Sequence, residues 1–269
     1  MIILNSWYGQ LGNNIIQLAN IIHIAITYKH NIKINVKKPD IFDLSVIEEY
    51  FNKYNNSEII TDNNNFFYSN NLPFSTIIFK QNVEERNEIL KKVFLIKNIN
   101  KLNENELVIH IRSGDIFISH PHPNYVPPPL SYYIKEIDKC KYEKIHIICE
   151  DTKNPVVNEL LKLYKNSVYE KNNLEKDIRI ILGATNIMFS IGTFIPSLLL
   201  MSNNIKFIHR PFKDERQHQI FFPSIVLSSN NIEVIDSSFE YKTQKYYKIM
   251  RPWKNTIEQR NYILTYDCN

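Results

Sequence analysis

The second half of the chain alternates short apolar runs that favour strands with segments of helical periodicity. The expected strands are residues 107–111, 144–149, 167–169, 186–189 and 205–209, and the expected helices are residues 131–139, 154–164, 174–184 and 196–201. In a βαβ unit the helix carries the chain back, so that successive strands run parallel. The pattern therefore predicts an α/β fold built on a parallel sheet.

The first residues repeat this order, with an expected strand at residues 2–5, a glycine loop, a long amphipathic helix and a strand at residues 32–36. The loop holds Gly9 and Gly12, and its position between a strand and a helix resembles that of a phosphate-binding turn. It lacks the third glycine of a dinucleotide fingerprint and the lysine of a P-loop, so a tight turn without a ligand is the alternative. Beyond it, helices are expected at residues 42–54 and 83–94, and a strand at residues 75–79.

The length of 269 residues allows two domains of ordinary size. The polar, asparagine-rich segment at residues 98–105 is the best boundary between them. We therefore expect one domain at residues 1–104 and a second at residues 105–230, followed by a C-terminal tail at residues 231–269.

Composition narrows the class of partner. The net charge is only +4 and no block of five basic residues occurs, which argues against a nucleic-acid surface but suits an anionic small molecule. No apolar run has membrane-spanning length. Three widely spaced cysteines favour a reducing compartment and give no metal-site pattern. The expectation is a soluble, cytoplasmic protein without a signal peptide, a membrane anchor or a metal site.

The run from Leu107 to Asp115 joins an expected buried strand to a polar loop. Because a strand alternates its faces, His110 and Arg112 should project on the same side, about 6 to 7 Å apart. Ligands of open parallel sheets bind at this end of the strands, and the planar guanidinium of arginine suits phosphate. The sequence thus predicts an anion site here. A surface pair of Arg112 with Asp115 in an edge loop is the alternative.

Two further strands are followed by polar residues that should lie along the same edge. Glu150 and Asp151 follow one strand, and a segment from Ser190 to Thr193 follows another. Hydroxyl groups and backbone N–H groups at the start of a helix bind anions, and a carboxylate such as Asp151 can accept hydrogen bonds from a base or a ribose. Together these groups describe a nucleoside diphosphate site. For Glu150 and Asp151, a helix cap is an equally good interpretation.

A proline-rich segment at residues 120–129 follows Asp115 and cannot form a regular helix or a central strand. It should be a semi-rigid loop beside the expected site. His120 and His122 in this loop could act as catalytic bases or metal ligands, but no third ligand is near. Solvated imidazoles on a rigid loop are the alternative.

The motifs resemble those of the GDP-fucose-dependent fucosyltransferase superfamily. His110-Ile-Arg112-Ser-Gly114-Asp115 resembles its His-x-Arg-x-Gly/Thr-Asp motif. Gly9-Gln-Leu-Gly12-Asn13, followed by Gln17, resembles the N-terminal motif of the α-1,2-fucosyltransferase branch, glycosyltransferase family 11-like. Ser190-Ile-Gly-Thr-Phe194 resembles that branch's Ser-x-Ser-Thr-Phe segment. The motifs share the order and spacing of that family and together span most of the chain.

The resemblance implies a glycosyltransferase-B fold with two Rossmann-like domains facing a cleft, and a C-terminal tail that packs back on the first domain. It also implies an inverting, metal-independent transfer of a sugar, L-fucose in that family, from a GDP-sugar to a glycan hydroxyl. Arg112 would stabilise the departing GDP at the β-phosphate, and Asp115 would hold Arg112. The remaining binding residues implied by the resemblance are His110, Ser113, Gly114, Asp151, Ser190, Gly192, Thr193 and Phe194, with Gly9, Gly12 and Asn13 from the first domain.

Some features depart from the family pattern or stay open. Ser113 replaces a second arginine that is usual in the branch, and Gly192 replaces a serine, so another nucleotide-sugar or a different linkage is an alternative. A catalytically inactive nucleotide- or carbohydrate-binding protein on the same fold is another. The general base is also open: His122 is assigned as the catalytic group, with His120, Asp115 and His23 as further candidates. The departures and the short chain suggest a divergent viral or microbial subgroup.

Overall fold

The computed structural model describes residues 1–37, 39–54, 58–61, 82–211, 232–236 and 244–267. The described residues divide into two compact units. The first comprises Met1–Ile99 and Thr193–Asn203, and the second comprises Asn100–Gly192 with residues 204–211 and 232–267. The boundary therefore falls five residues before the expected position. The expected strand at residues 75–79 lies outside the described residues.

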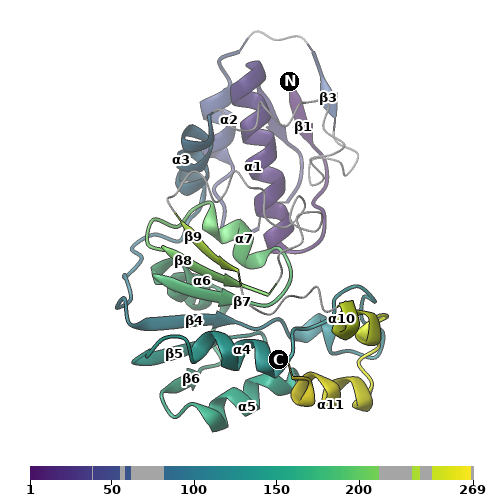
Figure 1. Ribbon diagram of the computed structural model, residues 1–269. Helices are drawn as coiled ribbons and strands as arrows, with labels where there is room; N and C mark the ends of the chain where they lie inside the picture. Colours follow the sequence, from purple (N-terminus) through teal and green to yellow (C-terminus); the bar gives the residue numbers. More distant parts are fainter. Residues whose placement is uncertain (38, 55–57, 62–81, 212–231, 237–243, 268–269) are drawn as a thin grey trace. The chain divides into compact units, whose positions relative to one another are not determined.

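The first unit contains a parallel sheet with β1 (Ile2–Leu4) between β2 (Ile32–Ile34) and β3 (Ile60–Thr61). Helix α1 (Leu11–Tyr28) connects β1 to β2 and is buried along most of its length (Figure 1). Its apolar residues recur at helical spacing, which explains why this segment forms a helix. The predicted βαβ unit is confirmed. Among the described residues of this unit, the other helices are α2 (Ser45–Phe51), α3 (Val83–Val93) and α7 (Phe194–Leu199).

The second unit contains six parallel strands in the order β6-β5-β4-β7-β8-β9. Counted along this unit, the order is 3-2-1-4-5-6, which is that of a doubly wound Rossmann sheet. The prediction of an α/β protein with parallel sheets is confirmed. The strands are β4 (Glu106–His110), β5 (Lys144–Ile148), β6 (Ser167–Tyr169), β7 (Asn186–Phe189), β8 (Phe207–Arg210) and β9 (Glu233–Asp236).

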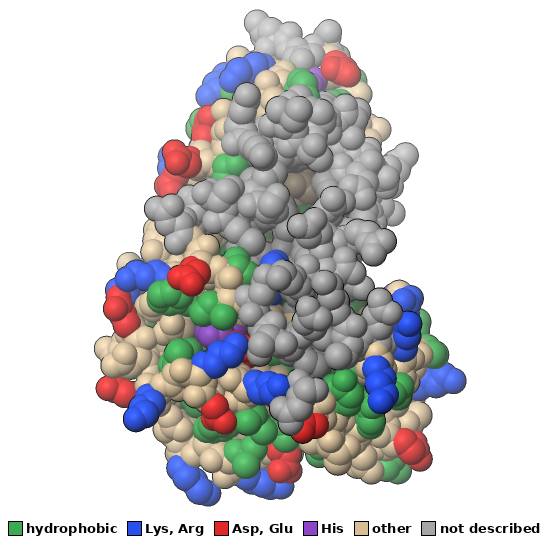
Figure 2. Space-filling model, viewed as in Figure 1, with side chains coloured by type: hydrophobic (Ala, Val, Ile, Leu, Met, Phe, Trp, Pro, Cys, Tyr) green, Lys and Arg blue, Asp and Glu red, His purple; other side chains and the backbone are tan. Residues whose placement is uncertain are grey.

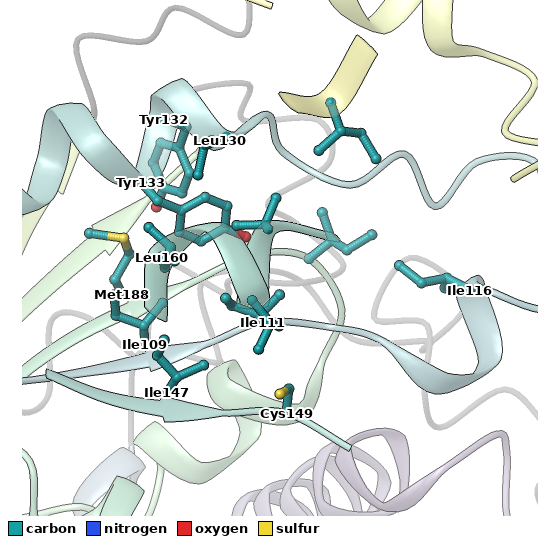
Figure 3. Close-up of a cluster of buried hydrophobic side chains, with 14 of the residues drawn as sticks. Ile109, Ile111, Ile116, Leu130, Tyr132, Tyr133, Ile147, Cys149, Leu160 and Met188 are labelled. Carbon is teal, nitrogen blue, oxygen red and sulfur yellow. The ribbon is translucent and has the colours of Figure 1, made fainter. Parts of the chain in front are cut away.

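Helices α4 (Leu130–Ile137) and α5 (Pro155–Leu163) pack on one face of this sheet. Figure 3 shows the core that they form, with Tyr132, Tyr133 and Leu160 facing Ile109 and Ile147 of the strands. Right-handed crossovers place the connection from β6 to β7, which is α6 (Leu174–Gly183), on the opposite face. The change of face lies between β4 and β7, in the middle of the sheet.

The C-terminal tail contributes α10 (Gln244–Met250) and α11 (Ile257–Thr265) to the second unit. Trp253 is buried and donates from Nε1 to the carbonyl of Ile116 at 2.6 Å, and the Tyr246 hydroxyl donates to Pro127 at 2.8 Å. Helix α11 packs against α4 and α5. The aromatic residues of the tail bury their rings in the second unit and satisfy their polar tips on carbonyls there, whereas the resemblance implied packing on the first domain.

A second difference concerns α7, which was expected within the second domain. It packs against α1 and is grouped with the first unit. Within the residues that the structure describes, no helix is long and apolar enough to cross a membrane.

Candidate functional site

The candidate site lies at the carboxyl ends of β4 and β7, where the strand order of the second unit reverses. Ligands of doubly wound sheets bind at such a point. The two strand ends are joined directly, because the backbone N–H of Arg112 donates to the hydroxyl of Ser190 at 2.9 Å. The backbone N–H of Ser190 in turn donates to the carbonyl of His110 at 3.1 Å. Ser190, which is buried, therefore fixes the chain at the point where Arg112 leaves the sheet.

The guanidinium of Arg112 is held on two sides. It donates from Nε and Nη2 to the two carboxylate oxygens of Asp115, at 3.2 and 2.8 Å. Its central carbon lies 4.1 Å from the centre of the Tyr125 ring, a cation–π contact. Asp115 receives two of the five N–H groups, and no other described residue accepts a hydrogen bond from Nη1 or from the second hydrogen of Nη2. The Arg112 side chain keeps 19 % of its surface exposed. The predicted pairing with Asp115 is present.

Gly192 provides the space that the guanidinium occupies. Its φ of +99° favours glycine, and a Cβ at this position would lie 2.6 Å from Nη1 of Arg112. A serine or alanine here could not coexist with the observed position of Arg112. The departure from the family pattern at Gly192 thus has a physical reason in this chain.

The loop after β4 is fastened by Asp151. Its Oδ1 accepts hydrogen bonds from the Ser113 hydroxyl, from the Gly114 N–H at 3.3 Å and from the Lys153 N–H at 3.0 Å. Burial acts to raise the pKa of Asp151, but these hydrogen bonds and the Lys153 ammonium outweigh it and lower the pKa to about 2. The ionised Asp151 carboxylate therefore acts as a clamp: its hydrogen bonds hold this loop in place, a role beyond the predicted binding of a nucleobase or ribose.

Ser113 shares this internal role. Its hydroxyl donates to Asp151 and accepts from the Asn154 N–H at 3.1 Å, and its side chain is buried. Asn154 caps α5 and also donates from its side chain to the carbonyl of Arg112 at 3.0 Å. The hydroxyl of Ser113 is thus used within the protein, and the position does not present a second charged side chain beside Arg112.

Replacing Asp151 with asparagine should remove this clamp. A pKa lowered from 3.8 to about 2 means that the carboxylate stabilises the fold above about pH 4, and that this contribution is lost as the pH falls towards 2. We expect Asp151→Asn to lower the free energy of unfolding by about 2 kcal/mol at pH 7. Urea titrations at pH 7 and at pH 3 measure it, and the difference between the two proteins should shrink at the lower pH. An equal difference at both values would contradict this role.

His110 and Gly114 flank Arg112. Burial, with a smaller effect from the positive charge of Arg112, lowers the pKa of His110 to about 3. Its imidazole is therefore neutral near pH 7, so it can serve a ligand by hydrogen bonding but not as a cation. The side chain of Glu150 lies over Gly114, where a Cβ would meet its carboxylate.

The histidines considered as bases lie in different places. His122 is exposed, its ring centre lies 4.7 Å from that of Tyr125, and its Nδ1 accepts from the Asn124 N–H at 3.2 Å. Tyr125 thus contacts both His122 and Arg112. His120 lines a separate cavity beside Trp253. His23 is buried in α1, which makes it a core residue of the first unit.

A second cluster belongs to the first unit and joins the glycine loop to α7. The Thr193 hydroxyl donates to the side-chain oxygen of Asn13, and a Cβ on Gly12 would lie 2.7 Å from the backbone nitrogen of Phe194. The side chain of Asn13 also lies over Gly9. The structure therefore brings together Gly9, Gly12, Asn13, Thr193 and Phe194. The other predicted site residues lie in the second unit.

The polar residues of α1 hold the same glycine loop. Gln17 is fully buried, and its Oε1 accepts from the Tyr8 N–H at 2.7 Å. Asn14 donates from Nδ2 to the carbonyl of Tyr8 at 3.2 Å. The side chains of Asn14 and Gln17, one turn apart on the helix, thus contact the loop at Tyr8, and that of Asn13 contacts it at Gly9. The structural role of Asn14 was not predicted from the sequence.

A substitution at Gly12 should destabilise the first unit. A new Cβ would press on the backbone of Thr193 and Phe194, which cannot move aside as a flexible side chain can. We expect Gly12→Ala to lower the free energy of unfolding by about 1 to 3 kcal/mol. Chemical denaturation measures the loss, with Ala19→Gly as a reference for an ordinary helix position. A Gly12→Ala protein of wild-type stability would show that α7 does not pack as described.

Comparisons with known proteins give limited information. No protein-family model matches the chain, and no curated protein matches it. Among solved structures it is similar to POFUT1 in complex with GDP, with 10% sequence identity and a TM-score of 0.41, over 76% of this chain and 95% of that one.

Tyr125 and Asn154 are the contributors that the sequence did not reveal. Tyr125 was seen only as part of a proline-rich loop, and Asn154 only as the start of a helix. A tyrosine inside a rigid loop that directly follows a basic site was the available signal for the first. For the second there was none, because its bond to Arg112 spans 42 residues.

Proposed function

We propose that this chain is an inverting glycosyltransferase that moves a sugar, L-fucose, from a GDP-sugar to a glycan hydroxyl without a metal ion. The observation that carries the proposal is the position of Arg112. Its guanidinium lies at the switch point of a Rossmann sheet, is oriented by Asp115 and Tyr125, and keeps donors for an anionic ligand.

The chemistry follows from the charge that the reaction creates. Breaking the bond between the sugar and the diphosphate places negative charge on the β-phosphate. A donor that is already oriented towards that oxygen stabilises the transition state more than the ground state. Nη1 and Nη2 of Arg112 would serve this purpose, because Asp115 occupies the Nε side of the fork.

The other groups would bind or position the donor. Neutral His110 would hydrogen-bond the nucleotide, and the loop clamped by Asp151 would present its backbone. We assign His122 as the base that accepts the proton of the acceptor hydroxyl. It is exposed, and it contacts the Tyr125 ring, which also contacts Arg112. A role of Thr193, Phe194, Asn13 and the glycine loop in donor binding stays a prediction from the sequence.

One specific observation favours the alternative of a binding protein without catalysis. Ser113 is buried and bonded to Asp151, so among the described residues the loop after β4 offers one arginine where the resemblance implies two. Such a protein would bind a nucleotide without cleaving the donor.

The test is thermal stabilisation by GDP, UDP, ADP and GDP-fucose in the presence of EDTA. We expect a rise in the melting temperature with the guanine compounds only, of about 5 to 10 °C at a hundredfold excess over Kd. Arg112→Ala should abolish the shift. Arg179→Ala, which removes an exposed arginine on α6, should keep it.

Donor hydrolysis and transfer to an acceptor are then measured with the same proteins. A guanine-specific shift without release of GDP from GDP-fucose would establish the binding alternative. A rise in melting temperature with UDP or ADP and not with the guanine compounds would mean that the donor carries that nucleotide in place of GDP. No rise with any nucleotide would overturn the proposal.

A further inference from the structure

The described end of the C-terminal tail, residues 244–267, has more basic than acidic side chains. It holds five basic side chains and two acidic ones, Glu258 and Asp267. Lys245, Lys248, Arg251 and Lys254 are exposed. On α10, Tyr246 and Met250 face the core, so Lys245, Lys248 and Ile249 share the opposite, outward face.

Large apolar side chains are exposed among these charges. Ile257 is 74% exposed, Ile249 is 52% exposed and Ile118 is 46% exposed. Ile118 belongs to the same surface, because Asn255 donates to its carbonyl at 2.9 Å. In Figure 2, basic and hydrophobic side chains lie side by side at the lower right, with acidic ones among them, where Figure 1 places α10 and α11. Glu258, which follows Ile257, is exposed as well. We call Ile118, Lys245, Lys248, Ile249, Arg251, Lys254 and Ile257 the tail surface.

A cavity of about 360 Å³ opens beside the tail surface. Its polar lining is Ser119, His120 and Lys254, and three proline rings form much of the rest. The two chain segments that build it are tied together, because the Trp253 N–H donates to the carbonyl of Pro123 at 2.9 Å. It is therefore a formed feature of the second unit, with a cationic side chain in its wall.

We propose that the tail surface docks the protein on an anionic lipid membrane, with a lipid phosphate in the cavity beside Lys254. Basic side chains are attracted to the negative surface of such a bilayer, and exposed isoleucines gain by entering its interfacial region. A nucleic acid would bind the basic side chains but would leave the isoleucines exposed to solvent. The tail surface contains none of the residues of the site around Arg112, so this proposal does not depend on the proposed function.

The test is sedimentation of the full chain with vesicles of phosphatidylcholine alone and of phosphatidylcholine with about one third phosphatidylserine. We expect binding only to the anionic vesicles, weakened by salt. Each basic residue contributes about fivefold to such binding, so Lys248→Glu with Lys254→Glu should weaken it about 25-fold or more. Ile257→Asp should weaken it as well.

The control is Lys141→Glu with Lys165→Glu, which makes the same change in net charge. These lysines precede β5 and β6, at the edge of the sheet opposite to the loop after β4. The control should bind like the wild type, and every variant should keep the wild-type melting temperature. Equal loss in the control, equal binding to neutral vesicles, no binding at all, or preferential capture by an RNA oligonucleotide would each overturn the proposal.

Discussion

Arg112→Ala should lower turnover by several hundredfold or more while the fold stays intact. Loss of one preorganised donor to a developing oxyanion typically costs about 3 to 4 kcal/mol of transition-state stabilisation. The effect should appear in kcat as well as in donor binding, because the negative charge on the diphosphate increases in the transition state. Initial rates of GDP release from GDP-fucose at saturating acceptor measure it.

Two variants make this result specific. Arg112→Lys keeps the positive charge but loses the fork that binds Asp115 and a second acceptor together, so it should recover only a small part of the activity. Arg179→Ala should behave like the wild type. Near-wild-type turnover in Arg112→Ala would remove Arg112 from the reaction and with it the assignment of the site.

Gly192→Ala should impair the same step without touching a charged group. The new methyl group would meet Nη1 of Arg112, which is the end of a flexible side chain, so the guanidinium would move away rather than unfold the loop. The positive φ adds a strain of about 1 to 2 kcal/mol, which should lower stability modestly. We expect a loss of activity of at least tenfold, since a misplacement of about 1 Å can cost a hundredfold.

A double-mutant cycle tests the cause. If Gly192→Ala acts through Arg112, its effect on turnover should nearly vanish in the Arg112→Ala background, because contacting residues are not additive. The same factor in both backgrounds would mean that Gly192 acts on the ligand or the backbone independently.

Elements with a strong local sequence pattern were predictable, and elements with a weak one were not. The four-residue strand β7 was expected with the bounds that the structure shows, because a short apolar run bounded by polar residues has few alternatives. Strand β9 was not expected, since Glu233–Asp236 has only two apolar residues, between two acidic ones, and lies at the edge of the sheet. The packing of the tail was assigned to the first domain because aromatic residues do not specify their partners.

Within the site, the residues near Arg112 in the sequence were predictable and the distant ones less so. Asp115 was expected to hold Arg112 because three residues of a tight loop bring the two side chains together. The clamp by Asp151 was not, because a carboxylate at a strand end can cap a helix, bind a ligand or fasten a loop. Only the neighbours Ser113 and Lys153 decide among these, and their side-chain directions depend on the folded loop.

The contacts of the Arg112 side chain also determine whether its rotamer entropy is lost on folding or on ligand binding. A free arginine side chain has about 2 kcal/mol of rotamer entropy to lose when it is fixed. In this chain, Asp115 and the Tyr125 ring fix it before any ligand arrives. The entropic cost is therefore met during folding, and an arriving diphosphate would find its partner already immobile. Tyr125→Ala should thus weaken binding by returning this disorder to the unliganded protein.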